Sequence, residues 1–467
     1  MDVYFICFMV FFITPGLCKS YIPIGFQVRI PVPSMYNSSF LGRAFFMETS
    51  NEVPNFKVAL SVEAVNGDYS CSLGVFLGDY RVWNSAHFMQ FYAREICMLE
   101  LTKYGDLQLR DSKGSIGWRS GTSLQGVEQR LQVLRSGNLI LTDVMNLIKW
   151  QSFNFPTDGM LWGQRLSIST FMTSFSNNSS IFFSFEILNS TLALYLNSGK
   201  LKYSYWEFRL SKNRSIAFAE FGSTGLKLFD GNVRKLAQIL PRKPEPLRFL
   251  AIEKNTGNLK FYHYSPFNGK FEASFEAINT TCDLPLACGP YSICTFSSNC
   301  TCIQFSRKVY GHDPNCSEDF SSKFCQSPSP VEMVEIMGVR SILRVPPQRV
   351  NVSKEECLNL CVHDCKCAAV LYSVTGSAIL LQECYHYGVV RGLKQVEHGI
   401  GLSYLVKVPK GVGGDSGKNW NAKTWLLITV GVIDGLVILL VVGGVGYYVF
   451  VIRRRNSQQE LRSGQLR

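Results

Sequence analysis

Short runs in which apolar and polar residues alternate occur repeatedly in the first half of the chain, and each contains a glycine near its start. The runs are YGDLQL from Tyr104, SGNLIL from Ser136, SGKLKY from Ser198, STGLKLFD from Ser223 and TGNLKF from Thr256. Glycine adopts a positive φ in a tight turn without steric cost, and alternation predicts a strand with one buried face. Repeated hairpins of this kind predict a mainly β fold built from a repeated unit.

The N-terminal apolar stretch is too short to cross a membrane. It runs from Val3 to Thr14 and is followed by small residues up to Cys18. This layout is typical of a secretory signal peptide, which we assign to residues 1–18, although the stretch is preceded by Asp2 rather than by a basic residue. The alternative is a buried N-terminal segment.

A second apolar run, in the predicted membrane helix at residues 424–452, is long enough to cross a bilayer with some tilt. The arginine triplet that starts at Arg453 places its C-terminal end in the cytosol. With the signal peptide, this predicts a single-pass type I protein of the plasma membrane. Residues 19–424 are then outside, and residues 453–467 form the cytosolic tail.

Asp434 lies inside this apolar run, between Gly431 and Gly435. A carboxylate facing lipid costs about 2.5–3.5 kcal/mol on insertion scales. One interpretation is that the Gly-x-x-x-Gly pair and Asp434 associate with another helix, in a homodimer or in a receptor partner. The alternative is a simple anchor that tolerates one carboxylate.

Nine N-x-[ST] sequons precede the predicted membrane helix, where N-glycosylation is possible. They lie at Asn37, Asn177, Asn178, Asn189, Asn213, Asn279, Asn299, Asn315 and Asn351. Of sixteen cysteines, fourteen remain once Cys7 and Cys18 leave with the signal peptide. An even number in an oxidising compartment predicts a disulfide framework. Cys71 and Cys97 have no other cysteine near them and are expected to pair within the β region.

Six cysteines fall between Cys282 and Cys316, and so short a segment needs disulfides because it buries little core. A zinc site at Cys300 and Cys302 is the less favoured alternative in an oxidising compartment. A flexible glycine-rich stalk is predicted at residues 409–423.

The section from Cys325 onward is predicted to contain one helix, started by a capping box of Ser353 and Glu356. Its cysteines recur every four residues and should share one face, with three further cysteines as possible partners. The helix cysteines are Cys357, Cys361 and Cys365, and the available partners are Cys325, Cys367 and Cys384. His363 and His386 could bind a metal beside these thiols, but solvent-exposed histidines are the favoured interpretation.

The formal net charge is +12. Without the signal peptide, membrane helix and tail, the predicted exterior has 42 basic and 32 acidic residues, a balance of +10. Such an exterior could bind acidic polysaccharide, but the charges are scattered and an ordinary solvated surface is favoured.

The segment VLRSGNLILTDVMNLIKWQSFNFPTDGMLWGQRLS resembles the S-domain of plant S-locus glycoproteins and G-type (bulb-type) lectin receptor kinases, with a Trp-Gln-Ser-Phe-x-x-Pro-Thr-Asp run at Trp150–Asp158. CDLPLACGPYSIC is similar to the EGF-like segment of that family, and EECLNLCVHDCKCAAVLYS to its PAN/apple module. The resemblance covers roughly residues 25–408, with the modules in the same order.

The resemblance implies the following modules. A bulb-type lectin β-prism domain spans residues 22–167, a second lectin-like or S-locus glycoprotein domain 168–277, an EGF-like module 278–320, and an α+β PAN/apple domain 325–408.

The resemblance also implies a disulfide pairing. The pairs are Cys282–Cys294, Cys288–Cys300 and Cys302–Cys316 in the EGF-like module, and Cys357–Cys384, Cys361–Cys367 and Cys325–Cys365 in the PAN/apple domain.

Mannose-binding relatives carry Gln-x-Asp-x-Asn-x-Val-x-Tyr, in which polar groups bind sugar hydroxyls and Val packs on the ring. In the best-matching repeat these five positions are Leu134, Ser136, Asn138, Ile140 and Thr142. The candidate carbohydrate-binding residues are therefore Ser136, Asn138, Ile140 and Thr142. Because Gln, Asp and Tyr are replaced, we expect weak or absent mannose binding and favour a plain hairpin.

These observations favour a cell-surface receptor-like glycoprotein that recognises an extracellular protein or glycan ligand, or partners an S-domain receptor kinase. The short tail leaves no room for a kinase, so signalling would need a partner. The alternative is a structural glycoprotein that tethers the membrane to acidic cell-wall polysaccharide. No catalytic motif, metal, cofactor or nucleic-acid partner is predicted.

Overall fold

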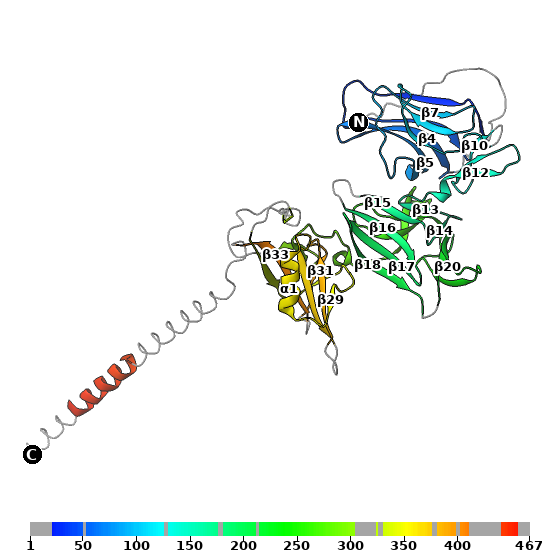
Figure 1. Cartoon of the computed structure of the whole chain (residues 1–467). Helices are drawn as coiled ribbons and strands as arrows, with labels where there is room; N and C mark the ends of the chain where they lie inside the picture. The colour runs from blue at the N-terminus through cyan, green and yellow to red at the C-terminus, as the bar shows by residue number, and fades with distance from the viewer. Residues whose placement is uncertain are drawn as a thin grey trace, which may run out of the picture.

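The structure is a computed structural model of the whole chain (Figure 1). It describes residues 21–49, 53–125, 129–175, 181–211, 214–303, 324–325, 330–375, 381–397, 402–410 and 440–455. The predicted signal peptide, most of the stalk and the end of the tail lie outside the described residues.

The first body is built from strands β1 to β12. Its bounds are β1 (Ile22–Pro23), β2 (Gln27–Pro31), β3 (Leu41–Glu48), β4 (Phe56–Val65), β5 (Asp68–Leu77), β6 (Tyr80–Asn84), β7 (Ile96–Leu101), β8 (Leu107–Arg110), β9 (Ile116–Arg119), β10 (Arg130–Val133), β11 (Leu139–Thr142) and β12 (Ile148–Gln151). In this described part, each of the first three strands starts a different four-stranded antiparallel sheet. The next nine strands then complete the sheets in reverse order: β4–β6 join β3, β7–β9 join β2, and β10–β12 join β1.

The second body repeats this topology with strands β13 to β24. Its bounds are β13 (Gly159–Leu161), β14 (Arg165–Ser167), β15 (Phe171–Phe175), β16 (Ile181–Leu188), β17 (Thr191–Ser198), β18 (Leu201–Arg209), β19 (Phe218–Gly222), β20 (Gly225–Phe229), β21 (Lys235–Ile239), β22 (Leu247–Ile252), β23 (Leu259–Ser265) and β24 (Lys270–Glu276). The sheets are again β15–β18, β14 with β19–β21, and β13 with β22–β24. The second body therefore begins at Gly159, whereas the sequence prediction started that domain at residue 168.

The glycine-containing runs form hairpin turns, as predicted. Four of their glycines lie in the turns between β7 and β8, β10 and β11, β17 and β18, and β22 and β23, and the fifth is the first residue of β20, directly after the turn from β19. All five have positive φ: Gly105, Gly137, Gly199, Gly225 and Gly257. The expected alternation is present on β8, where Leu107 and Leu109 are buried and Gln108 and Arg110 are half-buried. On β11 all four residues are buried, so both faces of that strand are covered.

A second repeated turn, which the sequence analysis did not identify, follows three of these hairpins. In each case an aspartate directly after the strand accepts hydrogen bonds from the backbone N–H groups two and four residues later. The aspartates are Asp111, Asp143 and Asp230. Such Asx turns fix the start of the third strand of each meander.

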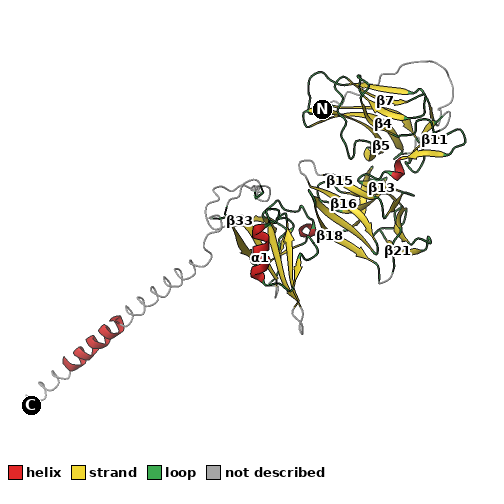
Figure 2. Cartoon of the chain, in the orientation of Figure 1, coloured by secondary structure: helices red, strands yellow, loops and turns green. Residues whose placement is uncertain are grey.

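The remaining sheets contain the cysteine-rich segment and the helix. Their bounds are β25 (Ser292–Cys294), β26 (Cys300–Cys302), β27 (Val331–Ile336), β28 (Val339–Ser341), β29 (Arg349–Val350), α1 (Lys354–His363), β30 (Ala369–Thr375), β31 (Leu381–Tyr387), β32 (Leu393–Gln395) and β33 (Leu402–Pro409). One sheet has the order β26-β25-β32-β28, and another has β27-β33-β30-β31-β29. We call residues 330–410 the helix section. Helix is sparse in the described part, as Figure 2 shows.

Helix α1 starts as predicted but ends earlier than the cysteine spacing required. The Ser353 hydroxyl accepts a hydrogen bond from the Glu356 N–H at 3.1 Å, which caps the first turn. Cys357 and Cys361 are buried on the helix, but α1 ends at His363. Cys365 therefore lies in the following turn and not on the helical face predicted for it.

The described residues contain six disulfides; one is the pair expected within the β region, and the other five join cysteines that the family resemblance paired. They are Cys71–Cys97, Cys282–Cys294, Cys288–Cys300, Cys325–Cys365, Cys357–Cys384 and Cys361–Cys367. Cys302 is also disulfide-bonded, and its expected partner Cys316 lies outside the described residues. Cys71 and Cys97 link β5 to β7, so their bond connects two sheets of the first body.

The second body lies between the first body and the helix section (Figure 1). On one side, the Trp83 indole N–H donates to the Phe155 carbonyl at 3.0 Å, and the Tyr80 ring stacks on Phe249 at 4.6 Å between centroids. On the other side, the core of the second body continues into the helix section. There Tyr203 stacks on Tyr387 with centroids 5.9 Å apart. Apolar packing therefore holds all three parts together.

Lys407 on β33 is a buried cation that caps the end of α1. The residue is 2% exposed. Its ammonium group donates to three carbonyl oxygens, those of Cys361 at 2.9 Å, Val362 at 3.2 Å and Asp364 at 3.0 Å. Carbonyls at a helix C-terminus lack helical hydrogen-bond partners and carry partial negative charge. The ammonium group therefore supplies hydrogen-bond donors and a compensating positive charge.

Among the residues that the structure describes, we find no helix with both the length and the apolar character to cross a membrane. Residues 440–455, in the region of the predicted span, are helical. Gly431, Asp434 and Gly435 lie outside the described residues, so their role in helix association stays a prediction.

The turn at Gly137 provides a test of the hairpin geometry. A Cβ atom there would lie 2.4 Å from the Phe56 ring and 2.7 Å from Leu161, and φ is +83°. We expect Gly137→Ala to lower the free energy of unfolding by about 2–4 kcal/mol, from backbone strain together with overpacking. Gly114→Ala is the matched control, because its φ is +86° and no atom lies within 4 Å. Gly114→Ala should lower the free energy of unfolding by about 1 kcal/mol, and urea denaturation measures both variants. Equal losses for the two variants would contradict the packing argument.

The cap on α1 can be tested at Lys407. Lys407→Met keeps much of the side-chain length but removes the ammonium donor from three carbonyls at the end of α1. The carbonyls of Cys361 and Asp364 keep a backbone N–H donor, so we expect the free energy of unfolding to fall by about 1–3 kcal/mol. Lys410→Met is the control, because Lys410 is exposed and should change stability by less than about 0.5 kcal/mol. Denaturation followed by far-UV circular dichroism measures both. A wild-type midpoint for Lys407→Met would show that the cap contributes little.

The junction of the two β bodies should weaken in acid. The His87 ring lies 2.7 Å from the Thr173 hydroxyl, and burial, helped by the Arg81 charge, lowers the pKa of His87 to about 4. Between pH 6.5 and 4 the unfolded chain holds the proton more tightly than the folded chain, so stability falls as the pH falls. We expect His87→Gln to reduce this loss of stability by about 1–2 kcal/mol. This is less than the free energy that corresponds to the whole difference in pKa between the folded and unfolded chain, because the ring is partly exposed and solvent screens its charge. Urea titrations at pH 7.5 and 4.5 measure it, and an unchanged difference between the two pH values would refute the assignment.

Candidate functional site

Asn138, the one motif residue retained in the best-matching hairpin, is used inside the protein. It follows the turn glycine and is 5% exposed. Its amide N–H donates to the side-chain oxygen Oε1 of Gln151 at 2.8 Å. Its oxygen accepts from the Ser152 hydroxyl at 3.2 Å and from the Phe153 N–H at 3.3 Å. Both ends of the amide are therefore occupied by the strand and turn that follow the hairpin.

The other positions of this motif offer little to a sugar. Ile140 and Thr142 are 4% and 1% exposed, and the Thr142 hydroxyl accepts from the Gln132 amide at 3.2 Å. The half-buried Ser136 hydroxyl accepts from the Asn138 N–H at 3.4 Å. Leu134 is exposed and apolar. The hairpin brings the predicted residues together but leaves no convergent set of free polar groups.

In two other hairpins the residue directly after the turn glycine also makes hydrogen bonds inside the protein, which the sequence analysis did not predict. Asp106 accepts from the Ser120 hydroxyl at 2.9 Å and from the backbone N–H groups of Gly121 and Thr122 at 2.8 and 3.1 Å. The Asn258 amide exchanges two hydrogen bonds with the backbone of Ile278, at 2.7 and 3.0 Å. The available signal was an Asn or Asp directly after the turn glycine in three of the five runs.

The hairpin at β22–β23 keeps two of the five sugar-motif residues, Asn258 and Tyr262, and was also overlooked. Lys260 occupies the Val position and pairs with Glu253 at 3.2 Å and Glu276 at 3.5 Å. The Tyr262 ring stacks on Phe249, with centroids 4.7 Å apart. Internal contacts therefore occupy this hairpin too.

The Trp150–Asp158 run connects the hairpin to the rest of the fold. The Trp150 ring packs edge-on against Trp83 and Trp118, with centroids 5.7 and 5.5 Å apart. Gln151 and Ser152 hold Asn138, as described above. Asp158 lies at the junction of the two β bodies, where burial raises its carboxyl pKa. The run therefore has a structural role in this chain.

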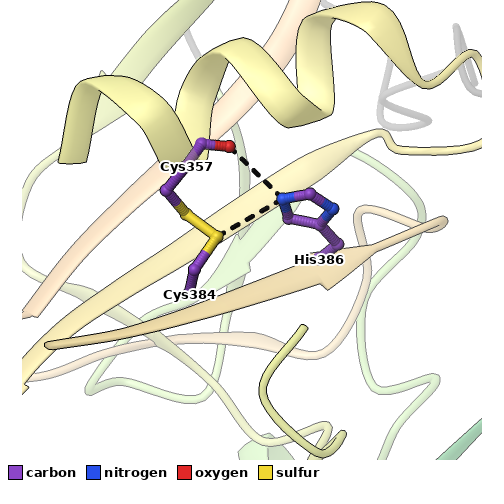
Figure 3. A group of neighbouring side chains, drawn as sticks. All are labelled: Cys357, Cys384 and His386. Atoms are coloured by element: carbon purple, nitrogen blue, oxygen red, sulfur yellow. Dashed lines mark hydrogen bonds between the residues drawn. A yellow bond between two sulfur atoms is a disulfide. The ribbon is translucent and has the colours of Figure 1, made fainter. Parts of the chain in front are cut away.

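The histidine and cysteine cluster in the helix section is a disulfide and not a metal centre (Figure 3). His386 Nε2 lies 3.4 Å from Cys384 Sγ and 3.3 Å from the Cys357 carbonyl oxygen. Because Cys357 and Cys384 are bonded to each other, neither sulfur is a thiolate that could bind a metal. His386 is half-buried and not exposed as predicted, and burial lowers its pKa. His363 is exposed on α1.

The zinc alternative at Cys300 and Cys302 fails for the same reason. Cys300 is bonded to Cys288, and Cys302 is disulfide-bonded as well.

A polar cleft of about 390 Å³ lies where the second body, the cysteine-rich segment and the helix section meet. The second body contributes Trp206, and the chain that leaves it contributes Asn279. The cysteine-rich segment contributes Asp283, and the helix section contributes three cations. These cations are Arg340, Arg344 and Lys394. The cleft was not predicted because its residues are distant in the sequence.

The charges in this cleft are unbalanced. Lys394 donates to Asp283 at 2.5 Å, and Asp283 also accepts from Thr280. Although burial works against ionisation, these bonds and the nearby cations lower the pKa of Asp283. One carboxylate therefore faces three cations.

Five predicted glycosylation sites lie within the described residues, and all five asparagines are exposed. They are Asn37, Asn189, Asn279, Asn299 and Asn351. Asn177, Asn178, Asn213 and Asn315 lie outside the described residues. The five described positions are sterically open to modification.

Residues 82–181 match the family model described as D-mannose binding lectin. The chain is 27% identical over 332 residues to a PAN domain-containing protein of Arabidopsis thaliana, covering 66% of this chain and 63% of that protein. It is 21% identical to a G-type lectin S-receptor-like serine/threonine-protein kinase of Arabidopsis thaliana, covering 66% of this chain and 38% of the kinase. An EP1-like glycoprotein of Arabidopsis thaliana is 26% identical, with 62% of this chain and 72% of that protein covered.

The matched region thus spans less than two thirds of the first two relatives. We conclude that the chain contains a bulb-type lectin domain within residues 82–181 and that its sequence is similar to plant proteins of the S-domain lectin type.

Proposed function

We propose that this protein is a receptor-like glycoprotein of the plasma membrane whose exterior recognises an extracellular ligand and partners an S-domain receptor kinase. A bulb-type lectin domain and receptor-like relatives support the proposal. Six disulfides and five exposed sequons in the described part suit an oxidising exterior. The relatives do not favour the alternative of a cell-wall tether.

The proposal includes the arrangement expected from the sequence. Two lectin-type domains are followed by an EGF-like module at residues 278–320 and a PAN/apple domain at residues 325–408. A signal peptide at 1–18 and a membrane helix at 424–452 give a single-pass type I topology. The helix and strands of residues 330–410, closed by disulfides, suit the α+β character of a PAN/apple domain.

One observation carries the functional interpretation: the buried Asn138 amide is hydrogen-bonded within the fold through both its nitrogen and its oxygen. The protein therefore has a lectin scaffold in which the sugar-motif hairpin has become a structural element. Recognition then depends on other surfaces, and no catalytic role is proposed.

Partnering can be tested by tagging the full chain, expressing it in plant cells and purifying it from membranes in mild detergent. We expect S-domain receptor kinases to co-purify at several times their level in a control with an unrelated single-pass glycoprotein. Mass spectrometry identifies them. Recovery of the same proteins in the control would refute the partnering proposal.

Mannose binding provides a separate prediction. We expect no retention of the full chain on immobilised mannose. Asn138→Ala should lower the free energy of unfolding by about 1–3 kcal/mol, because buried donors lose their acceptor. Ser136→Ala, the control in the same turn, should be close to neutral. Strong retention that Asn138→Ala abolishes, with stability unchanged, would show instead that the hairpin binds the sugar.

A further inference from the structure

We propose that the cleft between the second body, the cysteine-rich segment and the helix section binds an oligosaccharide built from uronic acid residues. In this assignment Arg340 and Arg344 hold a sugar carboxylate, and a sugar ring lies against Trp206. The inference rests on the proposed function, since it names the ligand class that the exterior recognises. It places the site away from the hairpins of the mannose motif.

The first support is an unfavourable pair of charges. Arg340 on β28 and Lys394 on β32 lie directly opposite each other in the antiparallel pair of strands. Like charges at opposed positions destabilise a sheet. Asp283 bonds to Lys394 and makes no ion pair with Arg340. Within the described residues, the exposed side chain of Arg340 makes no hydrogen bond, so its guanidinium group can bind an anion.

The second support is Arg344, which has only a weak partner. Its guanidinium group lies 4.0 Å from Glu207. That carboxylate already accepts two hydrogen bonds from Arg209, at 2.9 and 2.7 Å, and one from Ser204 at 2.7 Å. Arg344 is held in place by its backbone, which pairs with Ser204. The side chain therefore remains available while its base is fixed.

The carboxylate is the group that two neighbouring arginines bind well. A guanidinium group donates two parallel hydrogen bonds to a carboxylate, and such charge-assisted bonds are stronger than neutral ones. An anion between Arg340 and Arg344 would also relieve the repulsion between Arg340 and Lys394. The excess of positive charge in the cleft would thus be offset by the ligand.

The rest of the lining favours a sugar over an acidic peptide. Trp206 is partly exposed in the cleft, with buried Tyr205 and Ile342 beside it. Thr280 adds a hydroxyl oxygen that can accept a hydrogen bond while its O–H donates to Asp283. An aromatic surface with surrounding hydrogen-bonding groups suits a ring with hydroxyl substituents. A deep apolar recess for a peptide side chain is not found in the described lining.

The test measures binding of an oligogalacturonide to the full chain in lipid nanodiscs, by isothermal titration calorimetry. N-glycans are first trimmed with an endoglycosidase, because Asn279 lines the cleft. We expect binding that weakens as salt is raised, since part of it is electrostatic. The carboxyl-reduced oligosaccharide should bind at least about tenfold more weakly, because it loses a charge-assisted interaction.

Arg340→Gln and Arg344→Gln should each weaken oligogalacturonide binding about tenfold, with unchanged melting temperatures because both side chains are exposed. Arg234→Gln is the matched control: it removes one exposed charge from a turn of another sheet. Equal affinity of all three variants and wild type would overturn the assignment. So would equal binding of poly-glutamate, which would indicate attraction by charge alone.

These outcomes are separate from those of the proposed function. If receptor kinases co-purify equally with wild type and Arg340→Gln while no oligogalacturonide binds, the cleft assignment fails and the receptor-like role stands. If no kinase co-purifies but the oligosaccharide binds through Arg340, the partnering proposal fails alone.

Discussion

The hydrogen bonds made by the side chain directly after three of the turn glycines are the constraint on which the β bodies depend. Asn138, Asp106 and Asn258 each reach across to the backbone beyond the next strand. A hairpin alone is marginal in water, and a third strand must be held in register for a sheet to bury a face. In each of these meanders one side-chain amide or carboxylate holds the third strand in register. The same group accepts hydrogen bonds from backbone N–H groups that would otherwise be buried without partners. The aspartate turns after β8, β11 and β20 then set the start of the third strand.

The same constraint explains how a lectin scaffold can lose its sugar site without losing its fold. In this hairpin the Asn138 amide has a structural role, because its nitrogen and its oxygen both make hydrogen bonds inside the protein. Retention of a motif residue is therefore no evidence of binding when its polar atoms are directed inward. The recognition that we propose would then use surfaces such as the cleft around Trp206, which is assembled from three parts of the chain.

Local patterns in the sequence were sufficient for the hairpins, the turn glycines and the start of α1, because each depends on neighbours a few residues apart. The end of α1 was not predicted, since the regular cysteine spacing suggested a longer helix than the one that Lys407 caps. The start of the second body was placed too late, because β13 and β14 are short and pair with strands far along the chain. The cleft could not be predicted for the same reason: Trp206, Asp283 and Arg340 meet only through tertiary packing.

The order in which the sheets are completed has a kinetic consequence. Ile22 pairs with Leu131, and Gly159 pairs with Ala251, so each body joins its first strand to its last meander. Such long-range pairing is slow because the entropy of loop closure is lost before the contacts form. During synthesis, each body must wait for roughly its whole length to emerge before its first sheet can close. Until then the opening strand has an unpaired edge, which a chaperone would need to protect from association with other chains.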